Sequence, residues 1–224
     1  MKALLDADIL VYRVGFASKG ETEQIALSRL TETLTNIVYF DANCDSFDGF
    51  ITGHNNYRKD IAKIQPYKGN RTAPKPEHYD AMRKHLLKMG CVEVEGQEAD
   101  DAIGIAAYSS DPKEYVIITI DKDLNMIRGN HYNFVKKEFF IVDEDEALKF
   151  FYTQLLTGDR TDNIQGVPGI GPKKAEKMLA GLTTEAELYK ACKEAYNDDE
   201  TLLENARLLW IRREPNQLWC PPDA

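Results

Sequence analysis

The sequence predicts an α/β protein with a mostly parallel central sheet flanked by helices, followed by a smaller helical subdomain at its C-terminal end. Three observations support this prediction. Short apolar runs alternate with segments of helical periodicity over residues 1–142. Acidic residues follow these runs where strands should end. From residue 143 to 224 the pattern is helical, with a Gly-rich interruption at 166–171.

The individual elements follow from the same patterns. Pro76 and Gly90 mark the start and the end of one helix. Open α/β sheets bind ligands at the carboxyl ends of their strands, so we expect Asp6 and Asp121 on one edge of the sheet. Apolar runs predict strands at 2–7, 47–52, 91–94 and 115–120, and helical spacing predicts helices at 22–40, 77–89 and 98–109.

Composition narrows the class of protein. The 224 residues are 43% hydrophobic, which is enough for one compact core. Asp6 and Asp8 interrupt the apolar run that a signal peptide needs, and no segment reaches the roughly 18 apolar residues of a membrane span. We therefore expect a soluble, cytoplasmic protein with no membrane partner. The four cysteines form no C-x-x-C pair, which argues against a zinc knuckle or a disulfide framework.

The charge is distributed unevenly along the chain. The net charge is −9, yet residues 58–88 contain nine Lys and Arg against three acids, a local balance of +6 that leaves −15 for the rest. A basic segment can neutralise phosphates, although the total charge would repel them. A basic strip that faces acidic residues is typical of metal-assisted chemistry on phosphate esters.

Four short acidic groups form the strongest signal. Each alone has an ordinary explanation, because carboxylates favour helix N-termini and Asp often caps a turn. Together they would repel one another unless cations neutralise them. The set contains no His, so oxygen ligands predict two Mg²⁺ or Mn²⁺ ions rather than zinc. The groups are Asp6; Glu98, Asp100 and Asp101; Asp121 and Asp123; and Asp159 and Asp162.

Two further stretches indicate contact with nucleic acid. The glycines at 166, 169 and 171 allow a tight turn before a helix that begins at Pro172, and backbone amides at such a helix start can meet a phosphate. An ordinary Gly-Pro loop is the alternative. In the basic segment, Tyr67 could stack on an unpaired base while Lys68 and Arg71 neutralise a phosphate. A plain surface loop is the alternative there.

These residues resemble the 5′-nuclease family, which includes phage 5′-to-3′ exonucleases, flap endonucleases and the 5′-nuclease domain of bacterial DNA polymerases. The resemblance runs from Asp6 to about Leu209. It depends on five strings in the same order: LLDAD, PYKGNR, EADD, ITIDKDL and LLTGDRTDNIQGVPGIGPKKA. The last is similar to the family's second metal motif running into its helix-hairpin-helix element, here at 158–180.

The resemblance implies a PIN-like core with a basic arch over 58–88 and a role for each motif. Lys68 and Arg71 would be the catalytic basic pair. Asp6, Glu98, Asp100 and Asp101 would hold one Mg²⁺ or Mn²⁺, and Asp121, Asp123, Asp159 and Asp162 the other. The helix-hairpin-helix would grip duplex DNA with a bound K⁺. The implied DNA contacts are Tyr67, Gly166, Val167, Gly169, Ile170, Gly171, Lys173 and Lys174.

The chain departs from the family pattern at two places. Family members often carry a further Asp where this chain has Gly53, so we expect a weak first metal site that Gly53→Asp would strengthen. The stretch between Arg71 and Glu77 is brief, so we expect a small arch. Asp8 lies at a position that varies among relatives and is left outside the metal ligands.

The implied activity is a metal-dependent 5′-to-3′ exonuclease or structure-specific flap endonuclease that hydrolyses DNA, and RNA primers in RNA–DNA hybrids, by a two-metal mechanism. Its partners would be DNA 5′ ends, flaps and junctions. We expect a monomer that acts in DNA replication, in the host cytoplasm if phage-encoded. Two alternatives stay open: a PIN-type endoribonuclease, and a non-catalytic structure-specific DNA-binding module.

Overall fold

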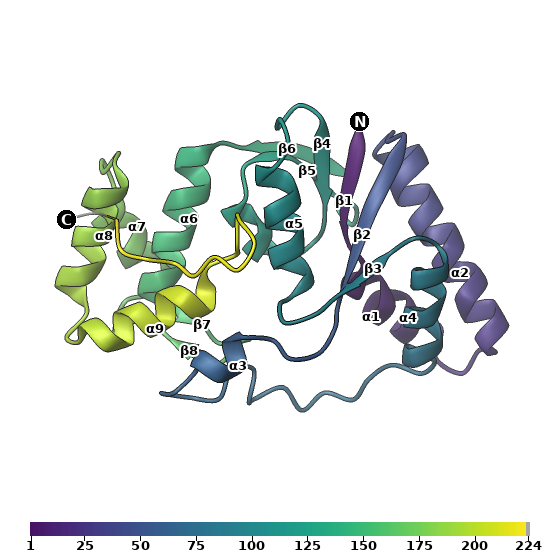
Figure 1. Cartoon of the computed structure of the whole chain (residues 1–224), viewed down its shortest axis with the longest axis horizontal. Helices are drawn as coiled ribbons and strands as arrows, with labels where there is room; N and C mark the ends of the chain where they lie inside the picture. The colour runs from purple at the N-terminus through teal and green to yellow at the C-terminus, as the bar shows by residue number, and fades with distance from the viewer. Residues whose placement is uncertain (223–224) are drawn as a thin grey trace.

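A computed structural model describes residues 1–222 and contains a six-stranded sheet flanked by helices on both faces (Figure 1). The strand order is β3-β2-β1-β4-β5-β6, and every neighbouring pair is parallel except β5 and β6. The predicted fold class is therefore confirmed. The strands are β1 (Lys2–Asp6), β2 (Ser46–Thr52), β3 (Val92–Val94), β4 (Tyr115–Ile118), β5 (Gly129–Asn133) and β6 (Glu138–Val142).

Two hydrophobic clusters hold the helices against the sheet. Alternate strand residues point to opposite faces, so Leu5 packs with the helices of one face and Leu4 with those of the other. The first cluster joins α1 (Ala7–Ala17), α2 (Glu23–Thr35) and α4 (Tyr79–Lys88). The second joins α5 (Ala99–Tyr108) to α6 (Glu144–Thr157), α7 (Pro172–Leu179), α8 (Glu185–Ala195) and α9 (Asp199–Leu209).

The C-terminal helices share this second cluster with the sheet, so the boundary predicted at residue 142 stays a prediction. Between α6 and α7, the two-residue strands β7 (Gly158–Asp159) and β8 (Ile164–Gln165) pair antiparallel. The segment 158–180, predicted as a helix-hairpin-helix, thus contains the β7–β8 hairpin and one helix, α7. The helix before this hairpin is α6, which lies outside the predicted range.

Some element predictions differ from the structure. The helix expected at 22–40 is α2 followed by a π-helical turn, η1 (Asn36–Asp41). The helix α1 was not predicted, because it follows β1 with no turn residue between them. The hairpin of β5 and β6 was also missed, since its turn contains two lysines and no Gly-Asn signal.

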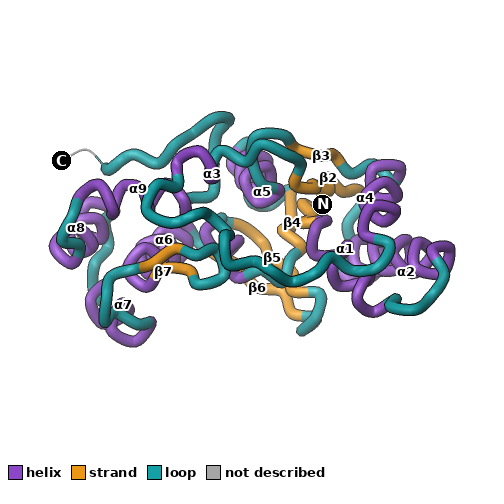
Figure 2. Tube along the Cα trace, turned by 90° about the horizontal axis from the view of Figure 1, so that it is seen from below, coloured by secondary structure: helices purple, strands orange, loops and turns teal. Residues whose placement is uncertain are grey.

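The basic segment forms a bridge rather than a helical arch. It begins with α3 (Arg58–Ile61), continues through 62–78 without helix or strand, and ends in α4. Seen from below, this loop crosses the molecule between the α3 end and the α4 end (Figure 2). The loop therefore spans the edge of the sheet where we expect ligands to bind.

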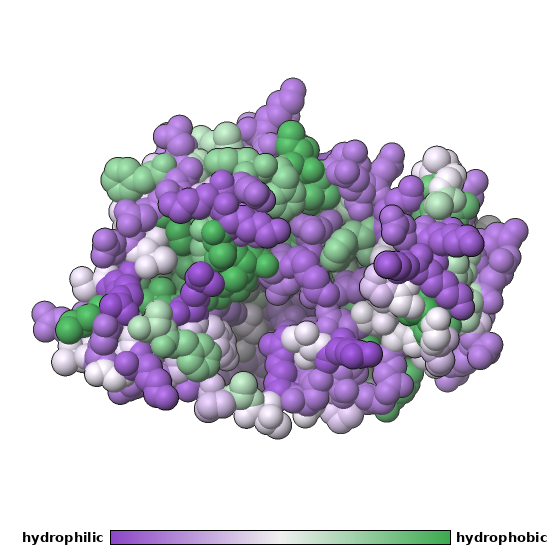
Figure 3. All heavy atoms as spheres, turned by 180° about the vertical axis from the view of Figure 1, so that it is seen from behind, coloured by the Kyte–Doolittle hydropathy of each residue, from purple (hydrophilic) through white to green (hydrophobic). Residues whose placement is uncertain are grey.

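On the face seen from behind, apolar residues gather in one region beside a broad hydrophilic area (Figure 3). The edge strand β6 exposes Phe139 and Ile141. Within residues 1–222, no helix combines the length and the hydrophobicity that a membrane crossing requires.

Candidate metal centre and nucleic-acid interface

Seven of the eight predicted metal ligands line two adjoining hollows at the carboxyl edge of the sheet. The larger is a cleft of about 700 Å³, and the smaller is a cavity of about 20 Å³. Glu98 and Asp100 line both, so the hollows share a wall at the start of α5. Asp6 and Asp121 complete the acids of the cleft with Asp8, and Asp123, Asp159 and Asp162 complete those of the cavity.

The acids of the cleft repel one another. Asp6 ends β1 and is 5% exposed, and burial together with the charges of Asp8 and Asp121 raises its pKa to about 8. Burial, Asp6 and Asp121 likewise raise the pKa of Asp100 well above its ordinary value. Buried carboxyl groups that raise one another's pKa are the setting in which a cation relieves the repulsion between them.

The acids of the cavity are held by protein donors. The Gln154 amide nitrogen lies 2.9 Å from Asp123 Oδ1 and 3.0 Å from Asp159 Oδ2. The Thr161 backbone N–H donates to the other oxygen of Asp159 at 2.7 Å. Burial and the neighbouring charges of Asp121 and Asp159 raise the pKa of Asp123 to about 7. The cavity is therefore also short of positive charge.

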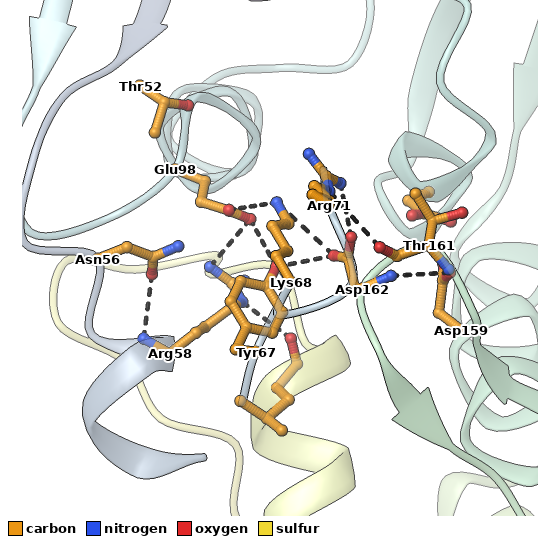
Figure 4. Close-up of polar contacts among 12 residues, drawn as sticks. Thr52, Asn56, Arg58, Tyr67, Lys68, Arg71, Glu98, Asp159, Thr161 and Asp162 are labelled. Carbon is orange, nitrogen blue, oxygen red and sulfur yellow. Dashed lines mark hydrogen bonds and ion pairs between the residues drawn. The ribbon is translucent and has the colours of Figure 1, made fainter. Parts of the chain in front are cut away.

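The basic pair lies directly on the acids (Figure 4). The Lys68 ammonium bonds Glu98 and lies 3.7 Å from Asp162, and Arg71 donates to Asp162 at 2.6 Å. Burial alone would raise the pKa of Glu98, but Arg58 and Lys68 outweigh it and hold that pKa below its ordinary value. Lys68 and Arg71 therefore lie at the junction of the cleft and the cavity, where they neutralise the carboxylates of Glu98 and Asp162.

Tyr67 does not have the environment expected of a base-stacking ring. It is only 7% exposed, and its hydroxyl lies 2.9 Å from Glu98 and 2.8 Å from Asp162. A phenol has one proton, so it satisfies only one of these two carboxylates at a time. Tyr67 thus connects acids of the two hollows. The exposed rings that line the cleft are those of Tyr12 and Phe16, on successive turns of α1.

Asp101 lies apart from the other predicted ligands. It is fully buried, and Arg58 binds both of its oxygens at 2.6 and 2.8 Å. The backbone N–H groups of Glu98 and Arg212 donate to the same carboxylate. It lines neither hollow, so its contacts are those of a buried ion pair, and its role as a metal ligand stays a prediction.

The donor set fits a hard divalent cation, since all the candidate ligands are carboxylates. Among residues 1–222, however, no three acidic, His or Cys side chains converge closely enough to form a ready coordination shell. Lys68, Arg71 and Gln154 bridge the acids instead. A cation would enter by taking over contacts that these donors now make.

The strand end at Gly53 has no room for a further acid. A Cβ atom there would lie 2.6 Å from the Val94 carbonyl oxygen and 2.7 Å from Glu95 Oε1. Besides Glu95, Asp8 already brings a carboxylate to this strand end, where it accepts from the Thr52 N–H at 2.8 Å and from Arg83 at 3.0 Å. Asp8 thus reaches from α1 to the end of β2.

The Gly-rich turn presents some of its predicted DNA contacts and buries others. Gly169 has a φ of +78°, and a Cβ at Gly169 or Gly171 would meet nothing within 4 Å. Lys173 and Lys174 are exposed in the first turn of α7. In contrast, a Cβ on Gly166 would lie 2.3 Å from Gly158 N. Val167 is half-buried and Ile170 buried in the hydrophobic cluster, so they anchor the turn.

The sequence alone did not identify Gln154, Arg58 or Asp8 as members of the site. Gln154 had a usable signal, because it is a polar residue on the apolar face of α6 beside Phe151 and Leu155. Arg58 had none, since its partner Asp101 lies 43 residues away along the chain.

Sequence comparison gives one family. Residues 2–152 match the family described as 5′-3′ exonuclease, N-terminal resolvase-like domain. DNA polymerase I of Rhizobium leguminosarum is 34% identical over 166 residues, which are 67% of this chain and 15% of that protein. The 5′-3′ exonuclease of Bacillus subtilis (strain 168) is 30% identical over 176 residues, 70% of this chain and 54% of that protein. The chain therefore spans at most about half the length of these relatives.

Solved structures show the same fold. The T5 D15 protein co-crystallised with metal ions has a TM-score of 0.70 at 18% identity, covering 93% of this chain and 88% of that one. The catalytic core of Rad2 in complex with a DNA substrate has a TM-score of 0.51 at 16% identity, covering 91% and 71%. With the family match over two thirds of its length, the chain belongs to the 5′-3′ exonuclease family, as its motifs predicted.

Proposed function

We propose that the chain hydrolyses phosphodiester bonds in DNA near 5′ ends, as an exonuclease or flap endonuclease that depends on divalent metal ions. One observation carries the proposal. Seven carboxylates, three of them with a raised pKa, line two adjoining hollows beside a Lys and an Arg at the carboxyl edge of the sheet. Family membership supports nuclease chemistry there.

We assign two Mg²⁺ or Mn²⁺ ions to the two hollows. Asp6, Glu98, Asp100 and Asp121 would hold one ion, and Asp123, Asp159 and Asp162 the other; this grouping moves Asp121 to the first ion and leaves Asp101 out. Bound ions of this kind act as Lewis acids on phosphate oxygens and lower the pKa of water. Lys68 and Arg71 would then turn from the carboxylates to the phosphate that is cut, and stabilise its developing charge.

The DNA would extend from this centre in two directions. The amides of the Gly-rich turn and the exposed Lys173 and Lys174 suit a duplex backbone, with K⁺ as the proposed companion ion. The single strand would follow the cleft, where Tyr12 and Phe16 rather than Tyr67 offer rings for base stacking. These contacts are to the phosphate backbone and to the faces of bases, which RNA also has. RNA–DNA hybrids are therefore a second proposed substrate. The proposed acting form is a monomer.

The test compares 5′-labelled and 3′-labelled duplex, flap, hybrid and single-stranded RNA substrates with and without magnesium. Wild type should release 5′ products only with the metal. Asp121→Asn and Asp159→Asn should each reduce cutting more than 100-fold, by about 3 kcal/mol of activation free energy. Duplex binding should stay within a few-fold.

The control is Asp111→Asn, an exposed acid before β4 at the opposite edge of the sheet, which should cut like wild type. Cutting of single-stranded RNA alone would indicate the PIN-type endoribonuclease instead. Duplex binding without cutting under any metal would indicate the non-catalytic binding module. Full activity of the two variants would remove their acids from the centre.

A further inference from the structure

Gln154 is a buried amide placed between two acids of the cavity. It lies in α6, one turn before that helix ends, and is 5% exposed. Its amide nitrogen contacts Asp123 Oδ1 at 2.9 Å and Asp159 Oδ2 at 3.0 Å. These acids come from separate elements, η2 (Lys122–Met126) and β7, so the amide fixes the spacing between them.

A neutral amide suits this position better than either alternative. An amide group carries two N–H donors, so each carboxylate receives one hydrogen bond. A Lys would supply the donors but would also add a charge that competes with a cation. An apolar side chain would leave two like charges without a shared donor, which is costly in a buried setting. The amide thus spaces the acids and leaves their charge available.

The remaining atom of the side chain indicates that the cavity takes a ligand. Gln154 Oε1 is buried and has no hydrogen-bond partner within the described residues. A buried acceptor without a partner costs about 1–3 kcal/mol. The adjoining cavity, of about 20 Å³, is large enough for one water or one small cation. A small hollow lined by carboxylates and an amide oxygen offers the oxygen ligands that Mg²⁺ prefers.

We propose that Gln154 is a positioning residue that sets Asp123 and Asp159 at the spacing required to receive a divalent cation. This inference depends on the proposed function, because it assigns that cation to the same cavity. The side chain acts through the two acids and does not touch the DNA. Outer partners that orient metal ligands commonly change metal affinity by about 10–100-fold when they are removed.

The test measures cation binding without DNA. Gln154→Met keeps the length and burial of the side chain and removes the amide, and Gln154→Lys keeps the donors and adds a charge. Titrating Mn²⁺ into each protein by calorimetry should give an affinity about tenfold weaker for Gln154→Met, and weaker still for Gln154→Lys. The magnesium concentration for half-maximal cutting should rise in parallel. Cutting at saturating magnesium should stay within about threefold of wild type.

Asn205→Leu is the matched control. Asn205 is also 5% exposed, and its amide donates to the Gln165 carbonyl and the Tyr196 hydroxyl, not to an acid. It should lower the melting temperature and leave Mn²⁺ affinity unchanged. If Gln154→Met and Gln154→Lys also leave Mn²⁺ affinity unchanged, Gln154 only fills the core and the proposal is wrong. If Gln154→Met does not fold, Gln154→Lys decides alone.

The outcome for wild type separates the two proposals. A wild type that binds no Mn²⁺ and cuts nothing would overturn the proposed function and this inference together. A wild type that binds and cuts, with variants of the same affinity, would overturn the inference alone.

Discussion

Arg58 binds Asp101 through two hydrogen bonds of 2.6 and 2.8 Å, and both side chains are at most 2% exposed. The same guanidinium donates to the Leu208 and Trp210 carbonyls. Arg58 opens the basic segment, Asp101 lies in the first turn of α5, and the two carbonyls belong to the end of α9 and the chain that follows it. One ion pair therefore connects three parts of the chain around the candidate centre.

Breaking this pair should unfold the protein more easily without changing metal binding. Asp101→Asn leaves Arg58 buried without its counter-charge, which we expect to lower the free energy of unfolding by about 3–5 kcal/mol in urea titrations. The control is Asp48→Asn, which removes the exposed Lys2–Asp48 pair and should cost at most about 1 kcal/mol. A stable Asp101→Asn protein with weakened Mn²⁺ affinity would return Asp101 to the ligand set.

Without divalent ions, stability should fall as pH rises. Burial and acidic neighbours raise the pKa of Asp6 to about 8 and that of Asp123 to about 7, from an ordinary value of 3.8. Between about pH 4 and pH 8 the folded chain therefore binds more protons than the unfolded chain, and this contribution is lost as pH rises through the folded values. In EDTA, the melting temperature should decrease from about pH 6 to about pH 8.5.

Calcium should reverse this trend, because an ion bound only to the folded state replaces the protons and stabilises that state by mass action. The measurement is thermal melting at several pH values in EDTA and in millimolar calcium. The melting temperature should rise in calcium, most strongly at the highest pH. Equal melting temperatures with and without calcium at every pH would show that the acids bind no ion.

The two lysines at the start of α7 should account for part of the salt dependence of DNA binding. Lys173 and Lys174 are exposed beside the open glycines of the turn. Each lost phosphate contact reduces the slope of log K against log salt by about 1, so Lys173→Ala with Lys174→Ala should flatten it by about 2. Lys190→Ala with Lys193→Ala, on the exposed surface of α8, is the charge-matched control. Equal slopes for both double variants would exclude the turn from the DNA interface.

The sequence predicted those parts of the site that depend on strand ends and helix starts. Asp6, Asp121 and Glu98 meet because parallel strands share a carboxyl edge and α5 begins beside it. The individual contacts were beyond this reasoning. Asp100 and Asp101 are adjacent in the chain, yet Asp100 lines both hollows and Asp101 lies in the core. Their difference is set by Arg58, whose position depends on the folded chain.

The same limit explains Tyr67. An aromatic ring between a Pro and a Lys in a basic stretch suggested exposure, but the loop folds back and the ring joins the hydrophobic cluster beside Glu98 and Asp162. Sequence patterns report which face of an element is apolar. They do not report how a long loop packs, because such packing has no period.

At Gly53, the resemblance to the family predicts that an added carboxylate strengthens metal binding. The structure argues against that result. Gly53 donates its N–H to the Val94 carbonyl at 2.8 Å, and any Cβ at residue 53 would press against that same oxygen at 2.6 Å. Because a backbone oxygen cannot swing aside, β2 and β3 would have to separate at this point.

We therefore expect Gly53→Ala and Gly53→Asp each to lower the free energy of unfolding by roughly 1–3 kcal/mol. Neither should lower the magnesium concentration for half-maximal cutting. The alanine variant is the essential comparison, since it adds the clash without the charge. A Gly53→Asp protein that is as stable as wild type and needs less magnesium than Gly53→Ala would show that the strand end can accept an acid. It would also restore the view that this site lacks a ligand that relatives have. If the prediction holds, the acid that serves the cleft from this strand end is Asp8, because it lines the cleft and its carboxylate reaches the Thr52 N–H from α1.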